Sequence, residues 1–152
     1  LQLLGAISDG NTPPTQDLCM ATIDFPDADY TDNPFFEVGP ADLTLAVGGN
    51  GVPLTDAYLS GSFTPSGDAI EGAVLTALLD TRPMVDLLQP GGPPNAVCSL
   101  FSSFGINCVA CPTGGNFCID LYVDDMVADR VSGLDLVERT QPVVDADPSC
   151  AP

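Results

Sequence analysis

The sequence predicts a mainly β (α+β) fold, an antiparallel β-sandwich or curled sheet with two short helices and disulfide staples. Three observations predict it. Apolar residues alternate with polar ones in several short segments. The 15 glycines and 15 prolines among 152 residues indicate many turns and short helices. Six cysteines, an even number, suit a disulfide framework. We expect an extended arm over residues 1–18 and a single disulfide-stapled domain over 19–150.

The expected strands are short and end at turn residues. They cover residues 19–25, 35–38, 42–47, 57–63 and 117–123, with another within 127–137 that is broken near Ser132-Gly133. Gly39-Pro40 is expected to end the second of them, because proline cannot donate to a sheet ladder. Residues 64–68 place proline and glycine as a type I turn with a glycine bulge requires, which predicts a hairpin after residue 63.

The segment that returns from this turn, residues 69–79, fits two patterns. Alternation in the strand period is shown by Ala73, Leu75, Ala77 and Leu79, whereas helical spacing is shown by Ile70, Val74 and Leu78. Asp68 with Glu71 would also make a capping pair for a helix. We favour a strand covered on both faces, because the preceding turn suits a hairpin.

Two short helices are expected between residues 82 and 104. The first begins at Pro83 and buries Met84, Leu87 and Leu88. The second covers residues 95–104 and ends at Gly105; its buried stripe consists of Val97, Leu100, Phe101 and Phe104.

The charge balance excludes two classes of partner. There are 21 acidic residues, three arginines and neither lysine nor histidine, so the net charge is −18. This charge repels nucleic-acid phosphates and anionic lipids, so we expect neither nucleic acid nor an anionic membrane surface as a partner. The acidic surface is interpreted as a solvated, aggregation-resistant one, with a cation-binding or salt-adapted surface as the alternative.

The cysteines indicate an oxidising compartment, so the protein is expected to be secreted, extracellular or in the outer cell envelope. We expect Cys19–Cys150 as one bridge and two more among Cys98, Cys108, Cys111 and Cys118. Zinc held by those four thiolates is an alternative, although a second Cys-x-x-Cys pair is missing. A redox pair of Cys108 and Cys111 is another, although an acidic, lysine-free surface opposes a low thiolate pKa.

One aspartate run has the composition of a calcium loop. Asp24, Asp27, Asp29 and Asp32 place hard oxygen ligands within ten residues, and calcium is the one cofactor that the sequence suggests. The run lacks the glycine and the closing glutamate of an EF-hand, and we favour a solvated turn over a calcium site. Arg82 is expected to pair with Asp80 or Asp86; an anchor for an anionic ligand is the alternative.

Catalytic signatures are missing from the sequence. Without histidine there is no Ser-His or Cys-His nucleophile system and no imidazole base. Paired carboxylates could hydrolyse glycosides, but sugar sites usually carry aromatic platforms and this chain has no tryptophan and three tyrosines. We therefore expect a protein that is not an enzyme.

Parts of the chain resemble a known group of proteins. The resemblance is carried by segments 61–70, 78–84 and 95–98 and by the spacing Cys108-x2-Cys111-Pro112-x5-Cys118. Over residues 19–131 the chain resembles uncharacterised exported proteins and lipoproteins of myxobacterial type. The resemblance implies export and assigns no activity. A mature lipoprotein would start at an acylated cysteine, whereas this sequence starts at Leu1.

We expect a non-catalytic structural or accessory subunit of an extracellular or cell-envelope assembly, with other protein subunits, identical or different, as partners. The apolar residues of the arm, Leu1, Leu3, Leu4 and Ile7, are the expected docking element. The alternative is a secreted module that binds calcium or a small apolar ligand between the sheet and the helices.

Overall fold

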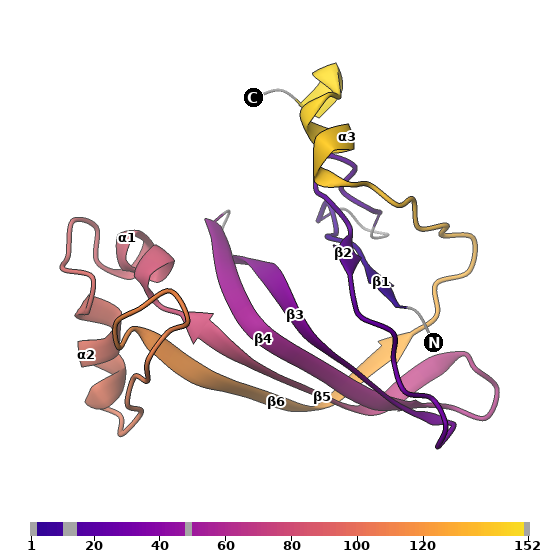
Figure 1. The fold of residues 1–152 in the computed structure, drawn as a ribbon, viewed down its shortest axis with the longest axis horizontal. Helices are drawn as coiled ribbons and strands as arrows, with labels where there is room; N and C mark the ends of the chain where they lie inside the picture. Colours follow the sequence, from indigo (N-terminus) through magenta and orange to yellow (C-terminus); the bar gives the residue numbers. More distant parts are fainter. Residues whose placement is uncertain (1–2, 11–14, 48–49, 151–152) are drawn as a thin grey trace.

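The structure is a computed structural model that describes residues 3–10, 15–47 and 50–150. Its main element is a curved antiparallel sheet in the order β3-β4-β5-β6, with α1 and α2 at one end and β1, β2 and α3 at the other (Figure 1). The strands are β1 (Leu4–Gly5), β2 (Ile23–Asp24), β3 (Phe35–Val47), β4 (Asn50–Phe63), β5 (Ala69–Asp80) and β6 (Cys118–Asp129). The helices are α1 (Val85–Leu88), α2 (Ala96–Ser102) and α3 (Gln141–Asp145), with 3-10 turns at Arg82–Met84 and Pro148–Cys150.

The mainly β, antiparallel fold is confirmed. Of the two predicted architectures, the described strands form the curled sheet and a separate two-stranded ribbon, β1-β2, and they do not close a sandwich. None of the described helices is long and apolar enough to cross a membrane.

The β4–β5 hairpin forms as predicted. Gly67 has a φ of 72° and its N–H donates to the carbonyl of Thr64 at 2.8 Å, while the N–H of Thr64 donates to Ala69 at 2.9 Å. This is the closed turn that proline and glycine at these positions favour. Residues 69–79 are accordingly strand and not helix, with Leu59 opposite Leu75.

The prediction that Gly39-Pro40 ends a strand is wrong, because β3 runs through this dipeptide as an irregularity in its pairing with β4. Gly39 has a φ of 136°, and a Cβ there would lie 2.6 Å from the carbonyl oxygen of Ala57. Only glycine fits this left-handed, close-packed position. Proline is tolerated next to it because β3 is an edge strand.

Irregularities in three strands accompany the curvature of the sheet. Asp56 on β4 (φ 51°), Gly72 on β5 (φ 57°) and Asp125 on β6 (φ 53°) lie where the strand registers shift. An extra residue in the left-handed region bends a strand and increases its twist. The sheet is visibly curved in Figure 1. Aspartate enters this region more readily than most side chains, which suits Asp56 and Asp125 to their positions.

The core lies along one face of the sheet in two clusters. In the first, Phe36 and Val38 of β3 are buried against Phe25 and Ala28, with Leu3 of the N-terminal segment beside them. The second lies farther along the strands and is formed by Leu54, Ala57 and Ala77. The residues that alternate with them, such as Tyr58, are exposed, as the period-two pattern predicts.

The two ends of the chain are joined to each other. Cys19 and Cys150 form a disulfide, Thr22 exchanges hydrogen bonds with Arg139, and the side-chain amide of Gln16 pairs with the backbone of Val137. The expected strand over 19–25 is reduced to β2, and the one expected within 127–137 is wrong. Instead, β6 continues to Asp129, and the chain beyond it bonds to side chains of the N-terminal segment and to Thr22.

The N-terminal segment is therefore not a free apolar arm. Strand β1 pairs with β2, Leu3 packs on the first core cluster, and Ile7 accepts a hydrogen bond from Asp17 through its carbonyl group. Leu1 lies outside the described residues. The packing of Leu3 and the pairing of β1 make this segment part of the folded molecule.

The two predicted helices are present but shorter, and their buried faces differ from the predicted ones. Val85, and not Leu87 or Leu88, is the buried residue of α1. In α2 the buried residue is Val97, as predicted, whereas Leu100 is half-exposed and the following Phe104 is 73% exposed. The apolar residues assigned to the core from helical spacing thus lie largely on the surface.

Candidate interaction surface

The aspartates of the suggested calcium loop do not converge. Asp24, Asp27, Asp29 and Asp32 are all exposed. The Asp29 carboxylate accepts hydrogen bonds from the Thr31 hydroxyl at 2.7 Å and from its backbone N–H at 2.9 Å, which lower the pKa of Asp29. Within the described part of the chain, no three of these carboxylates offer oxygens within 4.8 Å of one another. Calcium binding by this loop stays a prediction.

The cysteines are paired as disulfides. The bridges are Cys19–Cys150, Cys98–Cys108 and Cys111–Cys118, and no cysteine is free. The structure thus contains neither the zinc tetrathiolate nor the Cys108/Cys111 redox pair. One group of potential metal ligands does meet in space, Asp80 with Cys111 and Cys118. Its two sulfurs are bonded to each other, so they are not the thiolates that a metal needs.

Arg82 fastens the end of β5 to the disulfide-rich loop. Its Nε donates to both carboxylate oxygens of Asp80, at 2.9 and 3.1 Å, as the sequence predicts for this pair. Its Nη2 donates to the hydroxyl of Thr113, and its guanidinium lies 5.3 Å from the ring centroid of Phe117. The hydrogen bond from Arg82 lowers the pKa of Asp80, so the pair stays ionised. The charges of Arg82 and Asp80 therefore offset each other at the base of this loop.

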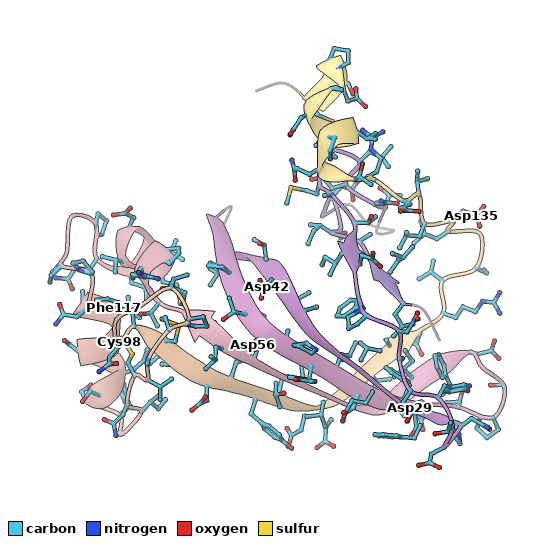
Figure 2. The ribbon with its side chains drawn as sticks, viewed as in Figure 1. Asp29, Asp42, Asp56, Cys98, Phe117 and Asp135 are labelled. Carbon is cyan, nitrogen blue, oxygen red and sulfur yellow. A yellow bond between two sulfur atoms is a disulfide. The ribbon has the colours of Figure 1, made fainter. Side chains whose placement is uncertain are left out.

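Thr81 makes a second connection at the same place. It is fully buried, and its hydroxyl donates to the carbonyl of Phe117 at 2.6 Å. The backbone N–H of Thr81 donates to the same carbonyl at 3.0 Å, and its hydroxyl lies 3.4 Å from the sulfur of Cys98. Cys98 and Phe117 lie together at this end of the molecule (Figure 2).

The segment fastened in this way carries no charge. Residues 87–119, which we call the neutral cap, contain no Asp, Glu, Lys or Arg, so all 21 acidic residues and the three arginines lie elsewhere. The cap comprises the end of α1, all of α2, the loop that follows and the start of β6, and it occupies one end of the sheet (Figure 1). The chain is thus acidic apart from this segment, which Asp86 of α1 and Asp120 of β6 border.

The neutral cap also exposes large apolar side chains. Those exposed on it are Leu87, Leu88, Leu100, Phe104 and Ile106. Leu100, Phe104 and Ile106 have no charged residue within ten positions of the sequence, whereas Leu87 and Leu88 directly follow Asp86. The exposed apolar residues Tyr122, Val127 and Val143 of other elements each lie two positions from an aspartate. Clustered apolar residues without charge mark contact surfaces, whereas single ones among charges are ordinary surface.

A groove lies between the two helices of the neutral cap. It has a volume of about 260 Å³ and is lined by Leu88, Gln89, Ala96, Val97 and Leu100. The helix and loop beside it are fixed by Cys98–Cys108, and the loop is fixed to β6 by Cys111–Cys118. The N–H of Val109 also donates to Cys118 at 2.6 Å. The α2 side of the groove and the loop that follows are therefore held in place by covalent bonds and a β-bridge.

A smaller cavity of about 150 Å³ lies between the N-terminal segment and residues 134–136. It is lined by Ile7, Leu134 and Leu136 together with Asp135 and four other residues. Asp135 lies far from Cys98 and Phe117 in Figure 2. Because this cavity is small and has a carboxylate in its wall, the neutral cap is the stronger candidate for an apolar partner.

The sequence patterns predict that most apolar residues of the neutral cap are buried. A usable signal was nevertheless present, namely a long uncharged segment in a chain with 16% charged residues. Leucine and phenylalanine within such a segment can pack inward or face a partner, and helical spacing does not separate the two cases.

No protein-family model matches the chain, and neither the curated proteins nor the solved structures give a significant match.

Proposed function

We propose that this protein is a non-catalytic subunit of an extracellular or cell-envelope assembly and that it docks on another protein through the neutral cap. The observation that carries the proposal is that Leu87, Leu88, Leu100, Phe104 and Ile106 are exposed within one uncharged segment of a chain of net charge −18. Apolar surface of this kind is stabilised when a partner removes it from water.

The charge distribution favours contact at the neutral cap. Around the rest of the surface, carboxylates would be stripped of water by an approaching partner, at a cost that apolar contact does not offset. At the neutral cap this cost is small, because its uncharged side chains include the exposed Leu100 and Phe104. The acidic remainder keeps the free protein in solution and discourages contacts at other places.

The rigidity of the neutral cap supports the same role. Two disulfides, the Arg82–Asp80 pair and the buried Thr81 hydroxyl hold it before any partner arrives. A surface that is already ordered loses little conformational entropy on binding, which raises affinity for a given contact area.

The chemistry of the chain supports a role in binding over one in turnover. The sequence has neither histidine nor lysine, and its six cysteines are joined in disulfides. The imidazole and amine bases are therefore missing, and nucleophilic attack by a thiolate or an amine is blocked or has no side chain to perform it.

The size of the groove favours a protein side chain over a small ligand. Pockets for small molecules usually measure about 300–1,000 Å³ and enclose most of the ligand. The groove of about 260 Å³ beside Leu88 and Leu100 is smaller than that. It suits one protruding apolar side chain of a partner, surrounded by a flatter contact.

Capture of proteins from the medium and envelope of the producing organism tests the proposal. Phe104→Asp and Leu100→Asp place a charge on the neutral cap. Val127→Asp and Val143→Asp are matched controls on β6 and α3, because their exposures, 65% and 49%, resemble the 73% and 48% of Phe104 and Leu100. Each variant adds one negative charge, so the net charge is the same in all four.

We expect the wild-type protein and both control variants to retain the same partner, and the two neutral-cap variants to lose it. Circular dichroism and thiol titration must show that every variant is folded and fully oxidised. A partner retained equally by all five proteins would overturn the proposal.

A further inference from the structure

We infer that the partner at the neutral cap is a second copy of this chain, in a two-fold dimer in which Phe104 of each copy enters the groove between α1 and α2 of the other. The inference rests on the proposed function and identifies the protein that docks on the neutral cap. It starts from a protruding ring and a groove that occur on the same uncharged surface.

The two features lie next to each other. Leu100 lines the groove, and Phe104 follows it four residues later, in the turn that continues from α2. The N–H of Phe104 donates to the carbonyl of Phe101 at 2.9 Å, so this turn keeps a helix-like course. Residues four apart in such a course lie on one side, about 6 Å apart along the axis. The ring therefore protrudes beside the groove, and it does not fill it.

A two-fold axis between Phe104 and Leu100 places each ring over the groove of the other copy. Such an interface is isologous, so one surface supplies both the protruding group and its receptor. An aromatic side chain that enters an apolar groove at the centre of an interface is the typical source of its binding energy. The groove walls Leu88, Val97 and Leu100 are the apolar contacts that a ring needs.

Charge explains why two copies would meet here and at no other place. Each copy carries −18, and contact through any acidic face brings carboxylates together. With the neutral caps in contact, the nearest charges are those that border the caps, such as Asp86 of α1, and most other carboxylates lie farther along the chain. At physiological ionic strength the Debye length is about 8 Å, so charges beyond that range repel only weakly. The remaining repulsion predicts that added salt strengthens the dimer.

The apolar patch is small compared with a permanent interface. Stable complexes bury about 1,200–2,000 Å² in total, and transient ones bury less. Five exposed apolar side chains per copy therefore predict a reversible dimer that dissociates on dilution.

Sedimentation velocity over a dilution series, from about 1 mM to about 1 µM, covers the range in which such interfaces dissociate. The full-length, oxidised protein is compared with Phe104→Asp, Leu100→Asp and the controls Val127→Asp and Val143→Asp at low and at physiological salt. We expect the wild type and the controls to shift from twice the chain mass of 15.7 kDa to the monomer mass on dilution. The neutral-cap variants should show at least a tenfold higher dissociation constant, and salt should lower that constant for the wild type.

A wild type that stays monomeric throughout overturns the dimer, as does a control variant that weakens association as much as Phe104→Asp does. A monomer that still captures a different protein through the neutral cap overturns the dimer and leaves the proposed function standing. A protein that neither forms a dimer nor captures another protein through the neutral cap overturns both the dimer and the proposed function. A monomer that binds zwitterionic phosphatidylcholine vesicles through Phe104 overturns the dimer and assigns the surface to lipid.

Discussion

At the scale of single residues, the joint between the two chain ends depends on Asp147. Its carboxylate accepts hydrogen bonds from the hydroxyl and the N–H of Ser149, at 2.6 and 3.0 Å, and from Arg139 at 2.7 Å. The bonds from Ser149 and Arg139 lower the pKa of Asp147 to about 2. Arg139 in turn bonds through its backbone to Thr22, directly before β2, so Asp147 connects the C-terminal segment to this part of the chain.

This pKa gives a pH dependence with a defined sign. A carboxyl group whose pKa is lower in the folded state stabilises that state while it is ionised. Its contribution is complete above the unfolded pKa of about 3.9 and is lost as the pH falls through about 2. We expect Asp147→Asn to lower the free energy of unfolding at pH 7, and the difference from wild type to shrink between pH 4 and pH 2.

Denaturant unfolding at a series of pH values measures that difference. Asp145→Asn is the matched control, because Asp145 is close in sequence and accepts a hydrogen bond only from Gln141 among the bonds described. If the free energy of unfolding of Asp147→Asn differs from that of the wild type by the same amount at every pH from 7 to 2, the role of Asp147 is contradicted.

At this scale the sequence predicts which residues bond to each other better than it predicts which side chains are exposed. The Asp80–Arg82 pair and the Cys19–Cys150 bridge follow from proximity and from cysteine number, and both are present. Burial depends on which face of a helix packs against another element, and a short helix at the end of the sheet has neighbours on one side only. Leu87 and Leu88 are exposed for this reason, since Val85 faces inward in their place.

At the scale of elements, the disulfides have separate tasks. Cys98–Cys108 spans 10 residues and holds α2 to its loop, whereas Cys19–Cys150 spans 131 residues and joins the two chain ends. In the chain-entropy model a loop of the first size stabilises the folded state by about 2–3 kcal/mol and one of the second by about 5 kcal/mol.

Replacing one bridge at a time should separate stability from docking. We expect Cys98→Ser with Cys108→Ser to cost about 2–3 kcal/mol and to weaken association through the neutral cap, because α2 loses its fixed position. Cys19→Ser with Cys150→Ser should cost about 5 kcal/mol and leave association unchanged under conditions where the protein is folded. Denaturant unfolding and sedimentation measure the two effects. Equal loss of association in both double variants would contradict the separation.

Strands were predictable where their turns are specified locally. The β4–β5 hairpin follows from one turn, since Pro65 and Gly67 fix its geometry and its register. Strand β3 was divided in the prediction because a bulge at Gly39 cannot be distinguished from a strand end without its partner strand. The chain after Asp129 has an alternating pattern, but in the structure it pairs with none of the described strands and bonds instead to the side chain of Gln16 and to Thr22.

At the scale of the whole molecule, the net charge of −18 makes stability sensitive to salt. Any salt screens the repulsion between carboxylates, and calcium at Asp24, Asp27, Asp29 and Asp32 would add a specific effect. If this loop binds calcium, millimolar CaCl2 raises the melting temperature more than NaCl of equal ionic strength, and Asp27→Asn with Asp29→Asn removes the excess. Equal melting temperatures in the two salts would leave a solvated acidic turn.

The central claim at this scale is that the molecule makes its contacts through the neutral cap. Site-specific photo-crosslinking tests it most directly, with p-benzoylphenylalanine in place of either Phe104 or Tyr122. Both residues are exposed aromatics, but Phe104 lies on the neutral cap and Tyr122 lies among aspartates on β6. The exchange of one aromatic side chain for another leaves the net charge unchanged.

Irradiation in the producing cells should yield a crosslinked product from position 104 and none from position 122. A product of twice 15.7 kDa identifies a second copy of this chain, and any other mass identifies a different subunit. A product from position 122 without one from position 104 would contradict the account.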